Sequence, residues 1–251
     1  MYRSFSLLLA FCALVLAGLP SAWSKTLRFS GYDWEVRGTG KGGPGPNQWD
    51  DANVRVDEKG RLHLKISKVD GEWRCAELQT KQRFGFGRYR FQVTGRIDTF
   101  DPYVVLGLFT YPTRDVGTDG TNEIDIEAAH WGRADGTNLG YVVYPASGKR
   151  QAPGDSKAVK FTLDDPRTTH EFEWTEKGVH FLSTRGHGGK VPAEKDKAGE
   201  ILRWDYAPAE ARLIPHDPCP VHLNLWLFRG HAPTDDKTVE IIIDRFTYEK
   251  R

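Results

Sequence analysis

The chain has 251 residues, and its 35 Lys and Arg residues almost balance 34 Asp and Glu residues, for a formal charge of +1. This near-neutral balance argues against nucleic acid or an anionic membrane surface as a partner, because both attract clustered positive charge. The length suits one large all-β domain. Aromatic residues make up 12% of the chain, which is compatible with a neutral polysaccharide as partner. A monomer is the default oligomeric state.

The chain begins with a stretch typical of a secretory signal peptide, expected over residues 1–24. Arg3 supplies a positive start, and Phe5–Leu19 is almost continuously apolar but too short to span a membrane comfortably. Cleavage after Ser24 puts two small residues, Ala22 and Ser24, where the peptidase requires them; cleavage after Ala22 fits less well. The mature protein is therefore expected to be secreted or periplasmic.

Short segments of alternating apolar and polar residues, typical of strands, run along residues 25–251, which are expected to form a single domain. In chain order they lie at Arg61–Ile66, Arg88–Val93, Tyr103–Tyr111, Asn122–Glu127, Glu171–Trp174, Gly178–Leu182, Val221–Trp226 and Val239–Tyr248. Helix signals are scarce, with one or two turns expected at Ala207–Arg212. Many short strands separated by Gly, Pro and Asp predict an all-β sandwich.

The most informative segment places Glu123, Asp125 and Glu127 in alternation with Ile124 and Ile126. On a strand the three carboxylates share one face, while the isoleucines enter the core. Neighbouring like charges raise one another's pKa values, and a glycosidase needs one ionised and one protonated carboxyl group. Alternating acids also occur on solvated sheet faces. They can hold calcium, although the flanking strand formers differ from the turn residues of a calcium loop.

The segment that follows Pro220 has the same alternation. Three leucines share the face predicted to enter the core, while His222, Asn224 and Trp226 share the other. A polar and aromatic row opposite a leucine row favours the wall of a cleft, and a solvated outer face is the alternative.

Two cysteines remain after the expected leader, Cys75 and Cys219. In an oxidising compartment they could form a disulfide, and two separate buried thiols are the equal alternative. The chain has no CxxC or HExxH motif, so no zinc cofactor is expected.

Taken in order, these segments resemble glycoside hydrolase family 16. The matching segments are Asp51–Val56, Gly60–Leu64, Cys75–Thr80, Phe84–Phe91, Gly107–Tyr111, Glu123–Glu127, Thr169–Trp174 and Leu223–Trp226. The resemblance implies a concanavalin-like jelly-roll β-sandwich of two antiparallel sheets with a concave substrate cleft. It also implies a retaining endo-glycosidase that hydrolyses a β-glucan-type polysaccharide by double displacement and requires no cofactor.

The resemblance implies that Glu123 is the nucleophile, Glu127 the general acid/base and Asp125 the helper between them. Retaining glycosidases, which keep the anomeric configuration of the sugar, need their two catalytic carboxyl groups about 5–5.5 Å apart. Residues four apart on a flat strand are about 13 Å apart at Cα, so the sheet is expected to curve. The single residue between Asp125 and Glu127 resembles the non-bulged, lichenase-like branch, although Thr121–Asn122 replaces the usual Trp-Asp.

Further residues are expected to contact the sugar. Glu77 matches a substrate-contacting Glu of lichenases, but Gln79 stands where an Arg would assist it. The other candidates are Asn47, Trp49, Trp131, Asn138, Asn224 and Trp226. Asp244 resembles a position that holds structural calcium in some members, whereas Trp34 and Trp174 are expected in the core.

Two alternative functions remain open on the same fold: a non-catalytic carbohydrate-binding module and a transglycosylase. A pure binding module has no need of paired acids, so the presence of both Glu123 and Glu127 favours an enzyme. The sequence does not distinguish water from a sugar hydroxyl as the acceptor.

Overall fold

The computed structural model describes residues 23–147, 155–188 and 199–251, and strands dominate them. In chain order the strands are β1 (Trp23–Phe29), β2 (Tyr32–Arg37), β3 (Gly40–Gly42), β4 (Asn47–Trp49), β5 (Val54–Val56), β6 (Leu62–Val69), β7 (Glu72–Arg74), β8 (Ala76–Phe84), β9 (Gly87–Thr94), β10 (Val104–Thr110), β11 (Glu123–Ala129), β12 (Leu139–Tyr144), β13 (Ser156–Val159), β14 (Arg167–Thr175), β15 (Gly178–Arg185), β16 (Glu200–Tyr206), β17 (Cys219–Leu227) and β18 (Val239–Lys250).

The helical content of the described residues consists of short 3₁₀ turns at Asp51–Asn53, Ile97–Thr99, Ala211–Leu213 and Phe228–Gly230. The third of these lies at the end of the segment expected to form one or two helical turns. In the described part of the chain, no helix is both long and apolar enough to cross a bilayer.

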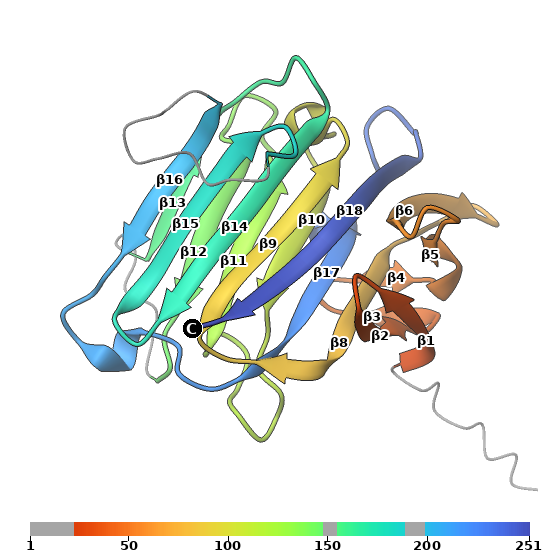
Figure 1. The fold of residues 1–251 in the computed structure, drawn as a ribbon. Coiled ribbons are helices and arrows are strands. Elements are labelled where there is room, and N and C mark those ends of the chain that lie inside the picture. Colours follow the sequence, from red (N-terminus) through yellow and green to blue (C-terminus); the bar gives the residue numbers. More distant parts are fainter. Residues whose placement is uncertain (1–22, 148–154, 189–198) are drawn as a thin grey trace, which may run out of the picture.

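Two large antiparallel sheets stack face to face (Figure 1). One has the order β1-β2-β8-β17-β10-β11-β12-β13, and the other has the order β16-β15-β14-β9-β18-β6-β5, with β7 paired to β6. The expected all-β sandwich of two antiparallel sheets is therefore confirmed. The first sheet carries β11, so we call it the cleft sheet.

The core lies between the sheets and follows the period-two patterns of the sequence. In β9, Tyr89, Phe91 and Val93 are buried and alternate with more exposed polar residues. Ile124 and Ile126 enter the core from the cleft sheet, as their alternation with the acids predicts. Trp34 and Trp174 are also fully buried, which confirms both as core residues.

The two cysteines do not form a disulfide. Cys219 lies opposite Phe84, at one end of the β8–β17 pair, whereas Cys75 immediately precedes the other end of β8. Phe84 follows Cys75 by nine positions along the strand, about 30 Å at the usual rise, and a disulfide needs Cα atoms within about 7 Å. Both are buried free thiols, and burial raises the pKa of each to about 12.

The start of β1 overlaps the expected leader by two residues. The strand begins at Trp23, and Ser24 donates a hydrogen bond to Asp51 Oδ2 at 2.7 Å. The expected cleavage point after Ser24 therefore falls inside a strand of the cleft sheet. Residues 1–22, which carry the rest of the expected leader, lie outside the described residues.

Candidate active site

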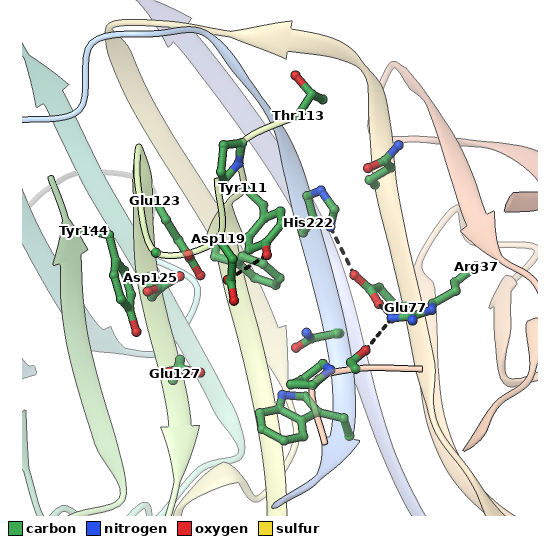
Figure 2. A pocket seen from close by; sticks show the side chains of 18 of the residues that line it. Arg37, Glu77, Tyr111, Thr113, Asp119, Glu123, Asp125, Glu127, Tyr144 and His222 are labelled. Carbon is green, nitrogen blue, oxygen red and sulfur yellow. Dashed lines mark hydrogen bonds and ion pairs between the residues drawn. The ribbon is translucent and has the colours of Figure 1, made fainter. Parts of the chain in front are cut away.

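A cleft of about 960 Å³ lies on the outer face of the cleft sheet. Its walls come from β1, β2, β8, β17, β10, β11 and β12, together with the loop between β10 and β11. Figure 2 shows Glu123, Asp125 and Glu127 in a row along β11, with Tyr144 beside them on β12. The structure therefore brings all three predicted acids into one cleft.

The end of the loop before β11 is fixed by Asn122. This residue adopts φ 51, a left-handed conformation that Asn tolerates better than most residues. Its N–H donates to Pro145 O at 2.9 Å, and its side-chain Oδ1 accepts from the N–H of His216 at 3.1 Å. The replacement of Trp-Asp by Thr-Asn before the first acid thus supplies an anchor for the catalytic strand.

Glu127 lies between two glycines. Gly107 of β10 and Gly140 of β12 are its direct cross-strand partners. Because residues directly opposite share a face of the sheet, the missing side chains leave room beside the carboxylate. A Cβ atom added at Gly107 would approach Asn224 Oδ1 to 2.5 Å, so Asn224 occupies the space above this glycine.

Glu123 has an unusual pKa. Burial raises it to about 8, the charge of Glu127 adds to the rise, and a hydrogen bond from Asp125 opposes it. The pair therefore holds a proton at neutral pH, as acid catalysis with retention requires. The expectation that Glu127 carries the proton as general acid stays a prediction.

The loop between β10 and β11 adds a polar pair that the sequence analysis missed. Tyr111 Oη donates to Asp119 Oδ1 at 2.8 Å, and both side chains line the cleft beside Glu123. The charge of Asp119 contributes to the raised pKa of Glu123. Burial, followed by the hydrogen bond to Asp119, raises the pKa of Tyr111, so the phenol remains a donor.

Glu77 on β8 lines the cleft and has two side-chain partners, Arg37 and His222. Arg37 Nη1 donates to Glu77 Oε2 at 2.5 Å, and His222 Nδ1 lies 3.1 Å from Oε1. Burial alone would raise the pKa of Glu77, but the hydrogen bonds and charges of His222 and Arg37 outweigh burial and lower it. Gln79 instead donates to Glu35. The guanidinium that the resemblance associates with position 79 comes here from β2.

The aromatic candidates separate into two groups. Trp131 and Trp226 both line the cleft, with ring centroids 6.2 Å apart and an interplanar angle of 62°. Trp49 is 1% exposed and does not line the cleft. It packs beneath Arg37, whose guanidinium carbon lies 4.2 Å from the ring centroid. Trp49 therefore positions Arg37, and the sugar-contacting role expected from sequence does not fit its burial.

Two of the three asparagine candidates are structural as well. Asn47 Nδ2 donates to Leu227 O at 2.9 Å, and Asn138 Nδ2 donates to Phe161 O at 2.9 Å. Each is 2% exposed and lies outside the cleft lining. Their amides satisfy backbone groups of distant segments, which sequence position alone does not reveal. Asn224 does line the cleft, and its buried Oδ1 has no hydrogen-bond partner among the described residues.

The expected calcium role of Asp244 stays a prediction. Thr94 Oγ1 donates to its Oδ2 at 2.7 Å, and His187 Nε2 lies 3.7 Å away. Across the three described ranges, no group of three or more His, Cys, Asp and Glu side chains is placed to hold a metal ion.

An antiparallel sheet with a row of carboxylates and aromatic side chains in one cleft is typical of a glycoside hydrolase of the jelly-roll class. The family model for glycosyl hydrolases family 16 matches residues 46–238, and the chain belongs to this family.

Solved structures of similar fold include a Bacillus licheniformis β-glucanase, with 20% identity, TM-score 0.62 and coverage of 87% of this chain and 92% of that chain. A lichenase from a mouse hindgut metagenome shares 23% identity, with TM-score 0.59 and coverage of 87% and 93%. A laminarinase from Flavobacterium sp. UMI-01 shares 13% identity, with TM-score 0.64 and coverage of 86% and 93%. No curated protein sequence matches the chain.

Proposed function

We propose that this glycoside hydrolase is an exported, retaining endo-hydrolase of a neutral β-glucan-type polysaccharide. The observation that carries the proposal is the row of Glu123, Asp125 and Glu127 in one cleft, with the pKa of Glu123 raised to about 8. Structural neighbours named as β-glucanase, lichenase and laminarinase support the substrate class. The proposed reaction uses no cofactor.

In the first step, Glu127 gives its proton to the glycosidic oxygen while the Glu123 carboxylate attacks the anomeric carbon. The bond from that carbon to the leaving sugar breaks, and an ester to Glu123 forms. In the second step, Glu127 removes a proton from water, and the resulting hydroxide displaces Glu123. One water is consumed for each bond cut, and both carboxyl groups return to their starting states.

For Glu123 to attack as a carboxylate, the proton held by the pair must lie on Glu127 when the substrate binds. A glycosidic oxygen beside Glu127 is a hydrogen-bond acceptor, and it favours the proton on Glu127 rather than on Glu123. Asp125 then stabilises the ionised Glu123, because its hydrogen bond lowers the pKa of that group. Asn224 also lines the cleft, where its side-chain amide can form a hydrogen bond with a sugar hydroxyl.

The charges of the cleft favour a neutral polymer. Its lining includes the carboxylates Glu77, Asp119, Glu123, Asp125 and Glu127, but only the guanidinium groups of Arg37 and Arg114. A sulfated or carboxylated polysaccharide would meet repulsion across most of the surface. The lining extends from β1 to β12, which suits an extended chain cut at an internal bond. Because such polymers lie outside cells, the segment before β1 is proposed to direct export.

The test is the release of reducing ends from mixed-linkage glucan, laminarin, xyloglucan and a galactan by purified protein. We expect one β-glucan to be cut, and Glu123→Gln to abolish the cutting. Glu249→Gln is the matched control, because this exposed residue lies on β18 in the opposite sheet. Retention is checked by following the anomeric configuration of the first product by NMR.

Other results would favour the alternative functions. Binding of one polymer without cleavage would identify a carbohydrate-binding module. Longer oligosaccharides formed without release of reducing ends would identify a transglycosylase. An inverted first product would contradict the role of Glu123 as nucleophile.

A further inference from the structure

Trp23 lies in the cleft, although it falls within the expected leader. It is the first residue of β1 and is paired with Arg37 of β2. Its side chain lines the cleft together with Arg37, Glu77 and His222. The ring centroid of Trp23 lies 6.2 Å from that of His222, at an interplanar angle of 66°. An indole thus borders the polar cluster that Glu77 forms with Arg37 and His222.

A β-bulge turns this indole toward the cleft. Leu27 and Phe29 pack into the core, and Trp23 has the same odd parity, so an uninterrupted strand would point it to the core side. The register shifts by one residue between Trp23 and Lys25, because Trp23 pairs with Arg37 and Lys25 pairs with Val36. The extra residue reverses the facing of Trp23, which is how bulges re-aim side chains beside active sites.

Further bonds hold the bulge in place. Ser24 Oγ donates to Asp51 Oδ2 at 2.7 Å, and Lys25 Nζ donates to the main-chain oxygen of Asp51 at 2.7 Å. Both contacts tie the start of β1 to the 3₁₀ turn at Asp51–Asn53. Trp23 itself stays partly exposed. A fixed, partly exposed indole beside charged hydrogen-bonding groups can cover the apolar face of a sugar while the charged groups bind its hydroxyls.

We propose that Trp23 is a platform for a glycosyl unit at the β1 end of the cleft, and that the working protein therefore retains it. The proposal rests on the proposed function and adds a binding position remote from the acids. Four strands separate β1 from β11, about 24 Å across a flat sheet at the usual spacing. Trp23 consequently acts on long chains, and short oligosaccharides bound at the acids do not reach it.

The proposal also fixes where a leader can be removed. Cleavage after Ser24 would delete Trp23, so hydrolysis must fall at or before the Ala22–Trp23 peptide bond. Water adds across that bond, and the new amino group belongs to Trp23 or to a residue before it. Ala22 supplies the small residue that a leader peptidase requires on its acyl side.

The first measurement is the intact mass and N-terminal sequence of the exported protein, expressed as the full chain. An N-terminus at Trp23 or earlier is expected. An N-terminus at Lys25 or later overturns the proposal, because the platform would be absent from the working protein.

The second measurement compares Trp23→Ala, Trp23→Phe and wild type on the polymer and on a short oligosaccharide of the same linkage. Loss of one stacking contact should raise the KM for the polymer about tenfold, with kcat within about twofold and the short substrate unaffected. Trp23→Phe should retain part of the binding. Trp73→Ala is the matched control, because Trp73 lies on β7 outside the cleft and beneath Lys68.

The outcomes separate this proposal from the proposed function. Cleavage of a polymer with an unchanged KM in Trp23→Ala overturns the platform and leaves the hydrolase function standing. If wild type cuts no polymer, affinity electrophoresis of Glu123→Gln with and without Trp23→Ala measures binding alone. Weaker binding in the double variant then supports the platform, and equal or absent binding overturns it.

Discussion

Glu123 and Glu127 face one cleft from the same strand, and the charge of Glu127 adds to burial in raising the pKa of Glu123 to about 8. Burial is the larger cause of the shift, and the charge of Glu127 adds to it because partial exclusion of water weakens the screening between the two carboxylates. The apolar neighbours of the row contribute to this exclusion, because Phe109 and Val142 are the cross-strand partners of Asp125. The carboxyl pair on β11 therefore holds a proton at neutral pH, and the proposed reaction needs one protonated carboxyl group there.

Replacing Glu127 by Gln should lower the pKa of Glu123. The substitution removes a negative charge that raises this pKa, but burial, the larger cause, remains. The pKa should therefore fall below 8 and stay above the ordinary value of a glutamic acid. Carbon-13 NMR of labelled glutamate side chains follows the titration directly. An unchanged or higher pKa in the variant would show that the two groups do not interact. Loss of the general acid should also lower kcat by roughly 10²–10⁴.

Glu123→Gln should stabilise the fold at pH 8 more than at pH 4.5. The folded-state pKa of Glu123 is raised to about 8, so the folded protein binds a proton that the unfolded chain has released above about pH 4.5. Stability from this group is therefore fully present below about pH 4.5 and is lost as pH rises through about 8. A neutral amide has no such dependence. Thermal unfolding should show a Tm gain of a few °C at pH 8 that shrinks at pH 4.5.

The control for this measurement is Glu249→Gln on the exposed surface of β18, which should leave the pH dependence of Tm unchanged. A Tm gain for Glu123→Gln that is equal at both pH values would show that Glu123 is not protonated in the folded state.

Cys75 and Cys219 should both be present as thiols in the folded protein. Burial raises the pKa of each to about 12, so neither supplies a reactive thiolate at neutral pH. Ellman's reagent should react slowly with the native protein and should titrate both thiols after unfolding. Reductant should leave Tm unchanged. A mass two hydrogens lower than that of the dithiol form would contradict the strand register that separates the two residues.

The sequence predicted best those features that depend on the alternation of polar and apolar residues within a single strand. The facing of Glu123, Asp125 and Glu127, and of His222, Asn224 and Trp226, follows from period two and is seen in the cleft lining. Strand positions also followed from local pattern, because apolar alternation reflects which face is buried.

Features that depend on pairing between distant strands could not be predicted from sequence. Arg37 reaches Glu77 because β2 lies beside β8, which no local pattern specifies. Asn47 and Asn138 are polar residues near predicted site segments, but their amides bond to carbonyls of Leu227 and Phe161. The side of the sheet on which Trp23 lies depends on a single extra residue in β1. A shift of one residue in the strand register moves a side chain to the opposite face of the sheet.

The glycines beside Glu127 provide a matched pair of substitutions. Gly107→Ala should be destabilising, because the new Cβ would meet Asn224 Oδ1 at 2.5 Å and Phe109 Cδ1 at 3.3 Å. Moving the amide out of a tightly packed position should cost about 1–3 kcal/mol of stability. It should also displace Asn224 from the sugar, raising KM. Gly140→Ala should be nearly neutral for stability, because its nearest contact would be Ala158 Cβ at 3.6 Å.

Both glycines are cross-strand partners of Glu127, so the comparison separates crowding of Asn224 from a general effect of adding a methyl group beside the acid. Urea unfolding and KM measurements on the two variants make the test. Equal destabilisation would show that the strand, rather than Asn224, resists the methyl group. If Gly107→Ala lost stability without a change in KM, Asn224 would not contribute to substrate binding. Asn224→Ala in the Gly107→Ala background should recover stability but not KM, because it removes the clash together with the proposed sugar contact.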